Sequence, residues 1–147
     1  MDDEAQEDLA IRLFEQAYRH QMKKELDEAV ELYKKSIETY WMGRIDDAIA
    51  ECQKAIEVDP MFGNPYNDIG SYLIMKGQID EAIPWLERAL QAPRYESYCY
   101  PHMNLGRVYE TKRDWLRAKE EYRKALAENK DYKPAAQGIA RIRGYLN

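Results

Sequence analysis

Residues 43–60 read GRIDDAIAECQKAIEVDP, a turn glycine followed by a helical pattern that ends at a proline. Apolar side chains recur every three or four residues, the spacing that places them on one face of an α-helix. The same pattern returns as GQIDEAIPWLERALQAP at 77–93 and as RDWLRAKEEYRKALAEN at 113–129. The chain therefore contains an internal repeat, and its period decides which fold to expect.

Alanines at fixed positions measure that period. Ala48 lies 34 residues before Ala82, which lies 36 residues before Ala118. The second alanine of each copy keeps the same intervals, at Ala55, Ala89 and Ala125. A period near 34 with room for two helices per unit predicts a helical solenoid, in which each unit packs only on its neighbours.

The segments 64–77 and 100–113 supply the partner helix of each unit. Both place a ring, an aliphatic side chain and a glycine on one face, and the glycines are Gly70 and Gly106. A glycine costs a helix about 1 kcal/mol relative to alanine, so its recurrence indicates close approach of a neighbouring helix. We expect helices near 8–23, 25–42, 45–57, 63–76, 79–91, 98–112, 115–128 and 133–145.

The front of the chain breaks the period. The small residue that precedes Ala48 in the pattern is Ala29, only 19 residues earlier, so half a repeat is missing near residues 38–42. In one interpretation a single helix, 25–42, serves both hairpins, and helix 8–23 packs where a preceding helix would lie. In a second the front helices pack on another chain by domain swapping. In a third the missing half was removed by engineering, and the sequence leaves all three open.

The last segment, 132–147, predicts one added helix that begins near Pro134. Ala136, Ile139 and Ala140 would cover the last repeat, because the outer face of a solenoid end has no further repeat to rest on.

These features resemble the tetratricopeptide repeat family, and the resemblance runs from about residue 8 to the end of the chain. It implies an all-α fold, a right-handed α-solenoid of antiparallel helix pairs with about eight helices including a C-terminal capping helix. We expect one domain, 1–147. Its parts are a frayed acidic lead-in (1–7), irregular front helices (8–42), regular repeats (43–131) and the capping helix (132–147).

Three residues depart from the family's pattern. Arg113 stands where the family favours glycine at a turn, and Lys130 stands where a closing proline is usual. Pro84 lies inside a predicted helix, where it deletes one backbone hydrogen bond and could bend or restart the helix.

Composition argues against several classes of function. The chain has 27 acidic and 22 basic residues, a net charge of −5, which argues against the basic field of a nucleic-acid surface. No apolar run reaches the roughly 18–20 residues that span a membrane, and the start MDDEAQED lacks the features of a secretory signal. Cys52 and Cys99 form no CxxC pair and are expected to be buried thiols of a cytoplasmic protein.

Catalytic patterns are absent from the sequence. The two histidines, His20 and His102, lie in separate repeats, and neither belongs to an HExxH or HxH pair. The glycines mark turns and helix contacts and form no phosphate-binding loop. We therefore expect no enzymatic activity, no cofactor and no metal.

The family resemblance implies a non-catalytic scaffold that binds a partner peptide or helix in a concave groove lined by the first helix of each unit. Tyr, Met and Arg are enriched in protein contact surfaces, and Asn can bond both groups of a peptide backbone. Periodicity selects as groove residues Tyr33, Tyr40, Asn67, Asp68, Ser71, Tyr100, Met103, Asn104, Arg107 and Arg141. The alternative is a homo-oligomer or a domain-swapped dimer in which the irregular front helices, residues 8–42, mediate self-assembly.

One subtype of the family grips a peptide's C-terminal carboxylate with Lys, Asn and Arg from three first helices. Among the corresponding positions of residues 63–141, only Asn104 matches that set. The resemblance therefore disfavours a carboxylate clamp in this chain.

Overall fold

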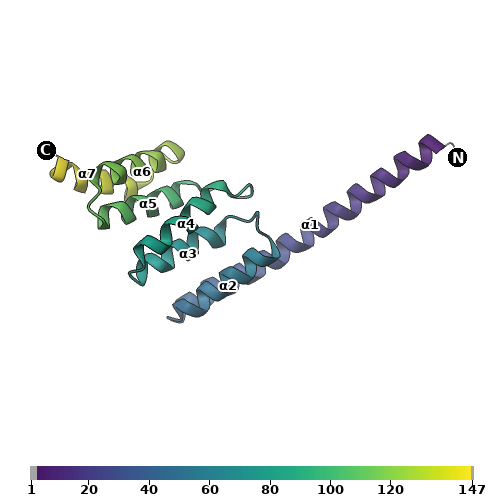
Figure 1. The fold of residues 1–147 in the computed structure, drawn as a ribbon, viewed down its shortest axis with the longest axis horizontal. Coiled ribbons are helices and arrows are strands. Elements are labelled where there is room, and N and C mark those ends of the chain that lie inside the picture. The colour runs from purple at the N-terminus through teal and green to yellow at the C-terminus, as the bar shows by residue number, and fades with distance from the viewer. Residues whose placement is uncertain (1–2, 147) are drawn as a thin grey trace.

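The computed structural model describes residues 3–146, and over that range the chain is entirely helical apart from its turns and joints (Figure 1). The helices are α1 (Asp3–Trp41), α2 (Ile45–Val58), α3 (Asn64–Met75), α4 (Ile79–Gln91), α5 (Cys99–Thr111), α6 (Trp115–Glu128) and α7 (Lys133–Leu146). The bounds of α2 to α7 agree with the predicted ones to within one residue.

The predicted break in the front of the chain is wrong, because α1 is one continuous helix of 39 residues. No glycine or proline occurs between residues 3 and 41, so nothing in the sequence ends the helix near residue 24. At 1.5 Å per residue it is about 58 Å long. Residues 3–7 of the expected acidic lead-in belong to this helix, and residues 1 and 2 lie outside the described range.

The helices stack as antiparallel pairs, α1 with α2, α3 with α4 and α5 with α6, and α7 covers the last pair. Figure 1 shows that only the C-terminal part of α1 lies along α2, while its N-terminal half projects away from the body. Residues 25–41 therefore act as the first helix of the first hairpin, as their forward pairing predicted. Residues 8–23 do not form the second arm of an earlier hairpin.

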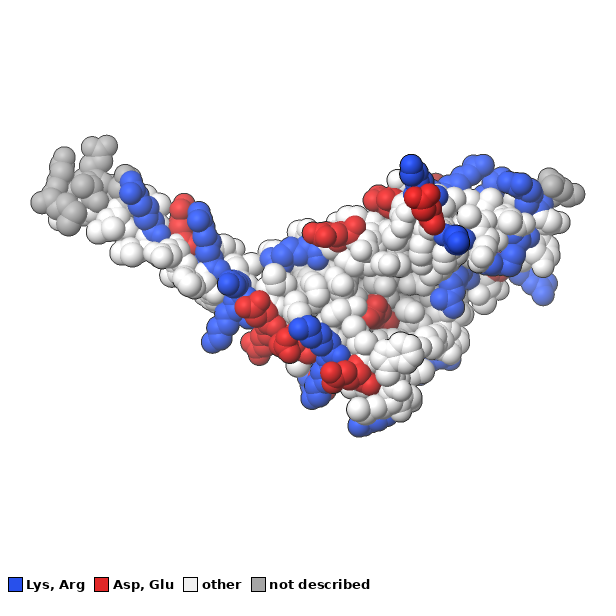
Figure 2. All heavy atoms as spheres, turned by 180° about the vertical axis from the view of Figure 1, so that it is seen from behind, with Lys and Arg blue, Asp and Glu red and all other residues white. Residues whose placement is uncertain are grey.

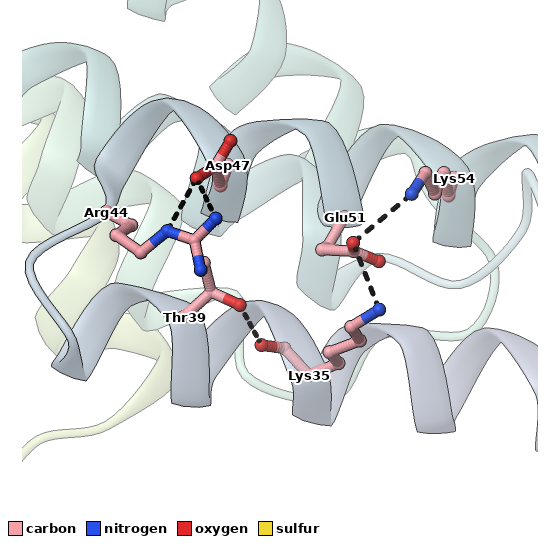
Figure 3. A network of polar contacts seen from close by, with 6 residues as sticks. All are labelled: Lys35, Thr39, Arg44, Asp47, Glu51 and Lys54. Atoms are coloured by element: carbon pink, nitrogen blue, oxygen red, sulfur yellow. Dashed lines mark hydrogen bonds and ion pairs between the residues drawn. The ribbon is translucent and has the colours of Figure 1, made fainter.

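A polar network on the outside of the first hairpin joins α1 to α2 (Figure 3). Glu51 accepts an ion pair from Lys35 of α1 at 3.4 Å and one from Lys54 of its own helix at 3.2 Å. Arg44 pairs with Asp47 at 2.7 Å at the start of α2. The ion pair between Lys35 and Glu51 thus joins the C-terminal part of α1 to α2.

Small residues form the seam inside each hairpin. A Cβ added to Gly70 would lie 2.4 Å from the Leu86 side chain, and one added to Gly106 would lie 2.5 Å from the Tyr122 ring. In the first hairpin Ser36 takes the glycine's place, and the Cys52 thiol donates a hydrogen bond to its hydroxyl at 3.2 Å. The three hairpins thus share one geometry, as the recurring small residues predicted.

The turns inside the three hairpins are equivalent. Gly43 and Gly77 have φ of 76° and 78°, in the left-handed region, and Arg113 adopts φ of 59° at the matching place. In each turn this residue's N–H bonds a carbonyl three residues back, and the next N–H bonds one five residues back. That is the bonding of a glycine-type helix end, so Arg113 holds a conformation that favours glycine.

The joints between units also contact each other. Arg94 donates its backbone N–H to the Met61 carbonyl at 3.0 Å, and Gly63 donates to the Arg94 carbonyl at 3.0 Å. The Arg94 side chain forms an ion pair with buried Asp59. These contacts hold the longer joint, 92–98, against the joint before α3.

The capping helix packs through a face offset from the predicted one. Ala135, Gly138 and Ile142 are buried in α7, whereas Ala136 and Ala140 are exposed. Gly138 lies against the Tyr122 ring on the side opposite Gly106. The prediction missed this offset because an alanine-rich helix offers more than one small face.

Candidate functional site

A cavity of about 250 Å³ opens where α1, α3, the 92–98 joint and the start of α5 meet. Its lining residues are Tyr33, Asn64, Asn67, Asp68, Tyr95, Ser97 and Tyr100. Four of these belong to the predicted groove set, contributed by three different first helices. The solenoid therefore brings together residues that lie up to 67 positions apart in the sequence.

Polar side chains behind the cavity form a chain of hydrogen bonds. Asn104 donates from Nδ2 to Asn67 Oδ1 at 3.0 Å, and Asn67 donates from Nδ2 to Asp68 Oδ1 at 3.3 Å. Arg107 Nη1 lies 3.5 Å from Asn104 Oδ1, at the far end of the chain. Both asparagines are buried, so this network fixes the position of the carboxylate at the cavity wall.

Tyr33 supplies the α1 wall of the cavity. Its ring meets Phe62 edge-on at 5.6 Å, and its hydroxyl interacts with the side chains of Asp68 and Asn64. Burial, and then the charge of Asp68, raise the pKa of Tyr33 above its ordinary value. The phenol therefore stays neutral and serves as a donor to the carboxylate.

Asp68 is the charged group of this site. Burial raises its pKa to about 6, and hydrogen bonds from Tyr33 and Asn67 offset only part of that effect. None of the seven lining residues is Lys, Arg or His. The site is thus a small polar cavity that carries one negative charge at neutral pH.

The remaining predicted residues take other places. Tyr40 stacks on Tyr72 at 5.0 Å between α1 and α3, and Met103 packs into the C-terminal core. Ser71 is partly buried in α3. Arg141 forms two hydrogen bonds to Glu110, at 2.9 and 3.0 Å, and does not line the cavity.

Sequence reasoning missed Tyr95 and Ser97, because it placed the groove on first helices alone, and it also left out Asn64, the first residue of α3. The one available signal was the length of the joint APRYESYCYP, which exceeds the others and carries two of these residues. Contacts with the preceding joint hold it beside α3, an arrangement that the sequence pattern does not encode.

A second hollow of about 510 Å³ adjoins the cavity and shares Asn64, Tyr95 and Ser97 with it. Its walls are more apolar, and its other lining residues are Leu26, Val30, Phe62, Pro93, Arg94 and Glu96. The two adjoining hollows are together called the groove, which is polar at Asp68 and apolar beside Leu26 and Val30 of α1.

Other hollows of the described residues lie along charged side chains of the first hairpin, such as one of about 480 Å³ beside Glu28, Glu31 and Lys34. On the face drawn in Figure 2, basic and acidic side chains mix along α1, and basic ones gather at the C-terminal end. Across residues 3–146, the His, Cys, Asp and Glu side chains nowhere gather into a group of three or more that could hold a metal ion. No helix in the described part of the chain is both long and apolar enough to cross a bilayer.

Over the described residues, the fold is an α-solenoid of antiparallel helix pairs. Two tetratricopeptide repeat family models match the chain, one over residues 42–97 and one over residues 101–132. The chain belongs to the tetratricopeptide repeat family.

Individual relatives agree with this assignment. Tetratricopeptide repeat protein 14 of Mus musculus is 26% identical over 123 residues, which cover 80% of this chain but only 16% of that protein. Among solved structures, the first TPR of Spaghetti (RPAP3) bound to the HSP90 peptide SRMEEVD has a TM-score of 0.75 at 20% identity, and the match covers 82% of this chain and 94% of that one. The second TPR domain of human RPAP3 with the HSP70 peptide SGPTIEEVD has a TM-score of 0.70 at 16% identity, covering 78% and 94%.

Proposed function

We propose that the chain is a non-catalytic interaction module that holds a segment of a partner protein in the groove between α1, α3 and α5. The observation that carries the proposal is the cavity around Asp68, where Tyr33, Asn67 and Tyr100 converge from three helices on one recess. Structural relatives hold short peptides, and a pre-formed groove with a few convergent polar groups suits such a ligand.

The groove's charge indicates a ligand different from those peptides. SRMEEVD and SGPTIEEVD end in acidic residues and a carboxylate, which require basic side chains in the site. The cavity of this chain instead presents Asp68, and its lining contains no basic residue. We therefore expect SGPTIEEVD to bind this chain no better than a scrambled peptide of the same composition.

A capture experiment tests the groove. The immobilised chain is exposed to a lysate of its source cell, and the captured proteins are compared with those held by Tyr33→Phe and Tyr100→Ala. Tyr33→Phe removes only a hydroxyl, and Tyr100 is 44% exposed, so both variants should fold. Leu116→Ala, on a side chain that is 72% exposed in α6, is the matched control.

We expect the control to retain the captured partner and both groove variants to lose most of it. Unchanged capture by both groove variants would reject the groove as the binding surface. Circular dichroism of each variant confirms that the helices are intact.

The projecting half of α1 favours a second candidate function, self-association. Leu9, Leu13, Phe14 and Tyr18 are 46%, 56%, 72% and 55% exposed, and they lie on a helical segment beyond the end of α2 (Figure 1). Apolar side chains exposed at this density mark contact surfaces. A second copy of the same helix would bury them by side-by-side pairing.

Light scattering after size exclusion, over a wide concentration range, tests this candidate. Self-association predicts a mass that rises toward twice 17.4 kDa and a return to the monomer in Phe14→Gln/Tyr18→Gln. A monomeric mass at every concentration would eliminate it, and the peptide-binding proposal would be unaffected.

A further inference from the structure

Asp68 differs from the other largely buried carboxylates of the chain in its partners. Glu51, Asp59, Glu110 and Glu121 each contact a cationic or protonatable side chain, respectively Lys35 and Lys54, Arg94, Arg141, and His102 and Lys124. Asp68 is bonded to the side chains of Asn67 and Tyr33, which are neutral. Within residues 3–146, no ion pair of Asp68 is found.

The titratable groups around Asp68 do not replace the missing cation. Tyr33 of α1, Cys52 of α2, Tyr72 of α3 and Tyr95 of the joint all interact with its charge. Burial is the largest cause in each case and raises the pKa of all four, so they are neutral near pH 7. The carboxylate therefore faces the open cavity without a counter-charge.

We propose that this cavity receives a basic side chain, arginine or lysine, from the bound partner segment, with Asp68 as its counter-ion. The inference rests on the proposed function and specifies the chemistry of its ligand. A charged group that is partly removed from water and unpaired raises the energy of the free protein, and an incoming cation removes that cost.

The walls of the cavity suit such a side chain. The rings of Tyr33, Tyr95 and Tyr100 line it, and a guanidinium or ammonium group is attracted to aromatic faces. Asn64 and Ser97 add side-chain oxygens that accept hydrogen bonds from a guanidinium's several N–H groups. A volume of about 250 Å³ is below the range of typical small-molecule pockets, so it fits one side chain rather than a whole ligand.

The adjoining hollow indicates which residue of the partner segment lies next to the basic one. Leu26, Val30, Phe62 and Pro93 line it and would cover an apolar residue next to the basic one. The partner segment that fits the whole groove thus carries arginine or lysine beside an aliphatic or aromatic residue. This pattern is opposite in charge to the acidic tails held by the structural relatives.

An NMR titration with two small probes tests the cavity directly. Backbone amide shifts of the full chain are followed while N-acetyl-arginine methylamide is added, and separately N-acetyl-citrulline methylamide, which has nearly the same shape but no charge. We expect the arginine probe to shift residues 64–68 and 95–100 and the citrulline probe to bind at least about tenfold more weakly, because the charge pair is lost.

Two variants at matched carboxylates sharpen the result. Asp68→Asn should reduce the affinity for the arginine probe at least about tenfold, whereas Glu57→Gln, at an exposed site on α2, should leave it unchanged. The affinity of the wild type should also fall between pH 7.5 and pH 5, because Asp68 has a pKa of about 6 and loses its charge on protonation. Asp68→Asn should show no such pH dependence.

The same variant is not expected to unfold. The raised pKa means that the folded chain favours the neutral form of this carboxyl group, so stability is lost as the pH rises from 3.8 toward about 6, and the loss is complete above that pH. Asn, which is neutral at every pH, should make the fold at least as stable at pH 7.5. Loss of binding in Asp68→Asn would thus report the missing charge.

Equal responses to the two probes, or an unchanged response in Asp68→Asn, would overturn the inference. A random-peptide display on the wild-type chain separates this failure from failure of the proposed function. Peptides selected without enrichment of arginine or lysine would contradict the inference and leave the groove proposal intact. Binding of the arginine probe without any selected peptide would support the cavity and contradict the groove proposal.

Discussion

The first and third hairpins have the same backbone plan and fill its seam in different ways. Between α5 and α6, Gly106 leaves room for the large ring of Tyr122, which is fully buried. Between α1 and α2, Ser36 and Cys52 meet at the same two positions, and both are fully buried. A larger residue on the first helix is thus paired with a smaller residue on the second.

The two seams also differ in the number of helices that their buried residues connect. The Tyr122 ring lies between Gly106 and Gly138, so it joins the third hairpin to α7, and its hydroxyl donates to Glu110 at 2.6 Å. The contact between Ser36 and Cys52 joins only α1 to α2. The third hairpin therefore depends on one large side chain, whereas the first depends on many small contacts along a long helix.

Truncation of Tyr122 and Cys52 to alanine should produce the largest difference between the two hairpins in the free energy of unfolding. Tyr122→Ala should lower the free energy of unfolding by about 4 kcal/mol, because it leaves a cavity between three helices. Cys52→Ala should cost only about 1 kcal/mol, since it removes one sulfur atom. Urea unfolding followed by circular dichroism measures both, and equal losses would contradict the proposed difference between the seams.

An exchange of seam residues tests whether the two positions depend on each other in size. Cys52→Leu should destabilise the chain by about 2 kcal/mol, because leucine is too large beside Ser36. Adding Ser36→Gly recreates the pair found at Gly70 and Leu86 and should restore at least about 1 kcal/mol. The double-mutant cycle by urea unfolding gives the coupling, and additive single effects would show that the two positions are independent.

Substitutions in the hairpin turns should change the free energy of unfolding by smaller amounts. Arg113 adopts φ of 59°, where Gly43 and Gly77 occupy the matching positions. A side chain in this region costs about 1 kcal/mol, so Arg113→Gly should raise the free energy of unfolding by up to that amount. Gly43→Ala should lower it by a similar amount, and no Cβ clash contributes, since an added Cβ meets nothing within 4 Å. Thermal unfolding of both variants measures the pair, and a decrease for Arg113→Gly would reject the strain.

Local patterns in the sequence explain why most of the fold could be predicted. Ala48 and its counterparts are fully buried because only small side chains fit where helices cross, so their spacing gives the helix pairs directly. The prediction for the front helices, residues 8–42, was wrong for a different reason. The segment MKKELDEA resembles the turn MGRIDDA in its charged residues but has no glycine, and without one a helix continues.

The candidate site was predictable only in part, because it depends on two levels of structure. Tyr33 and Asp68 come from helix periodicity, which the sequence shows. Tyr95 and Ser97 come from the joint that Arg94 holds against the chain before α3, a tertiary contact with no local signal. The residues that periodicity placed in the groove but the structure places elsewhere, such as Arg141, were assigned without knowledge of their ion pairs.

Acid should weaken the packing of α7 on the third hairpin, and we expect this change in stability to be the smallest of those predicted. Glu110 of α5 accepts hydrogen bonds from Arg141 of α7 and from Tyr122 of α6. The Arg141 bonds, more than the opposing effect of burial, lower the pKa of Glu110 below its ordinary value of 4.5. The anionic form is thus favoured by folding, so its stabilising contribution is complete above about pH 4.5 and is lost as the pH falls through the lowered pKa.

Because Arg141 is 53% exposed, solvent screens this pair and we expect its contribution to be below about 1 kcal/mol. Glu110→Gln should therefore speed hydrogen exchange of the α7 amides by up to about fivefold at pH 7, and the variant should lose less stability than the wild type between pH 5 and pH 3. Glu57→Gln serves again as the control, because Glu57 lies on α2, far along the solenoid from α7. If exchange in α7 were the same in all three chains, the ion pair would not fasten the cap, and the Tyr122 ring alone would hold α7 to the third hairpin.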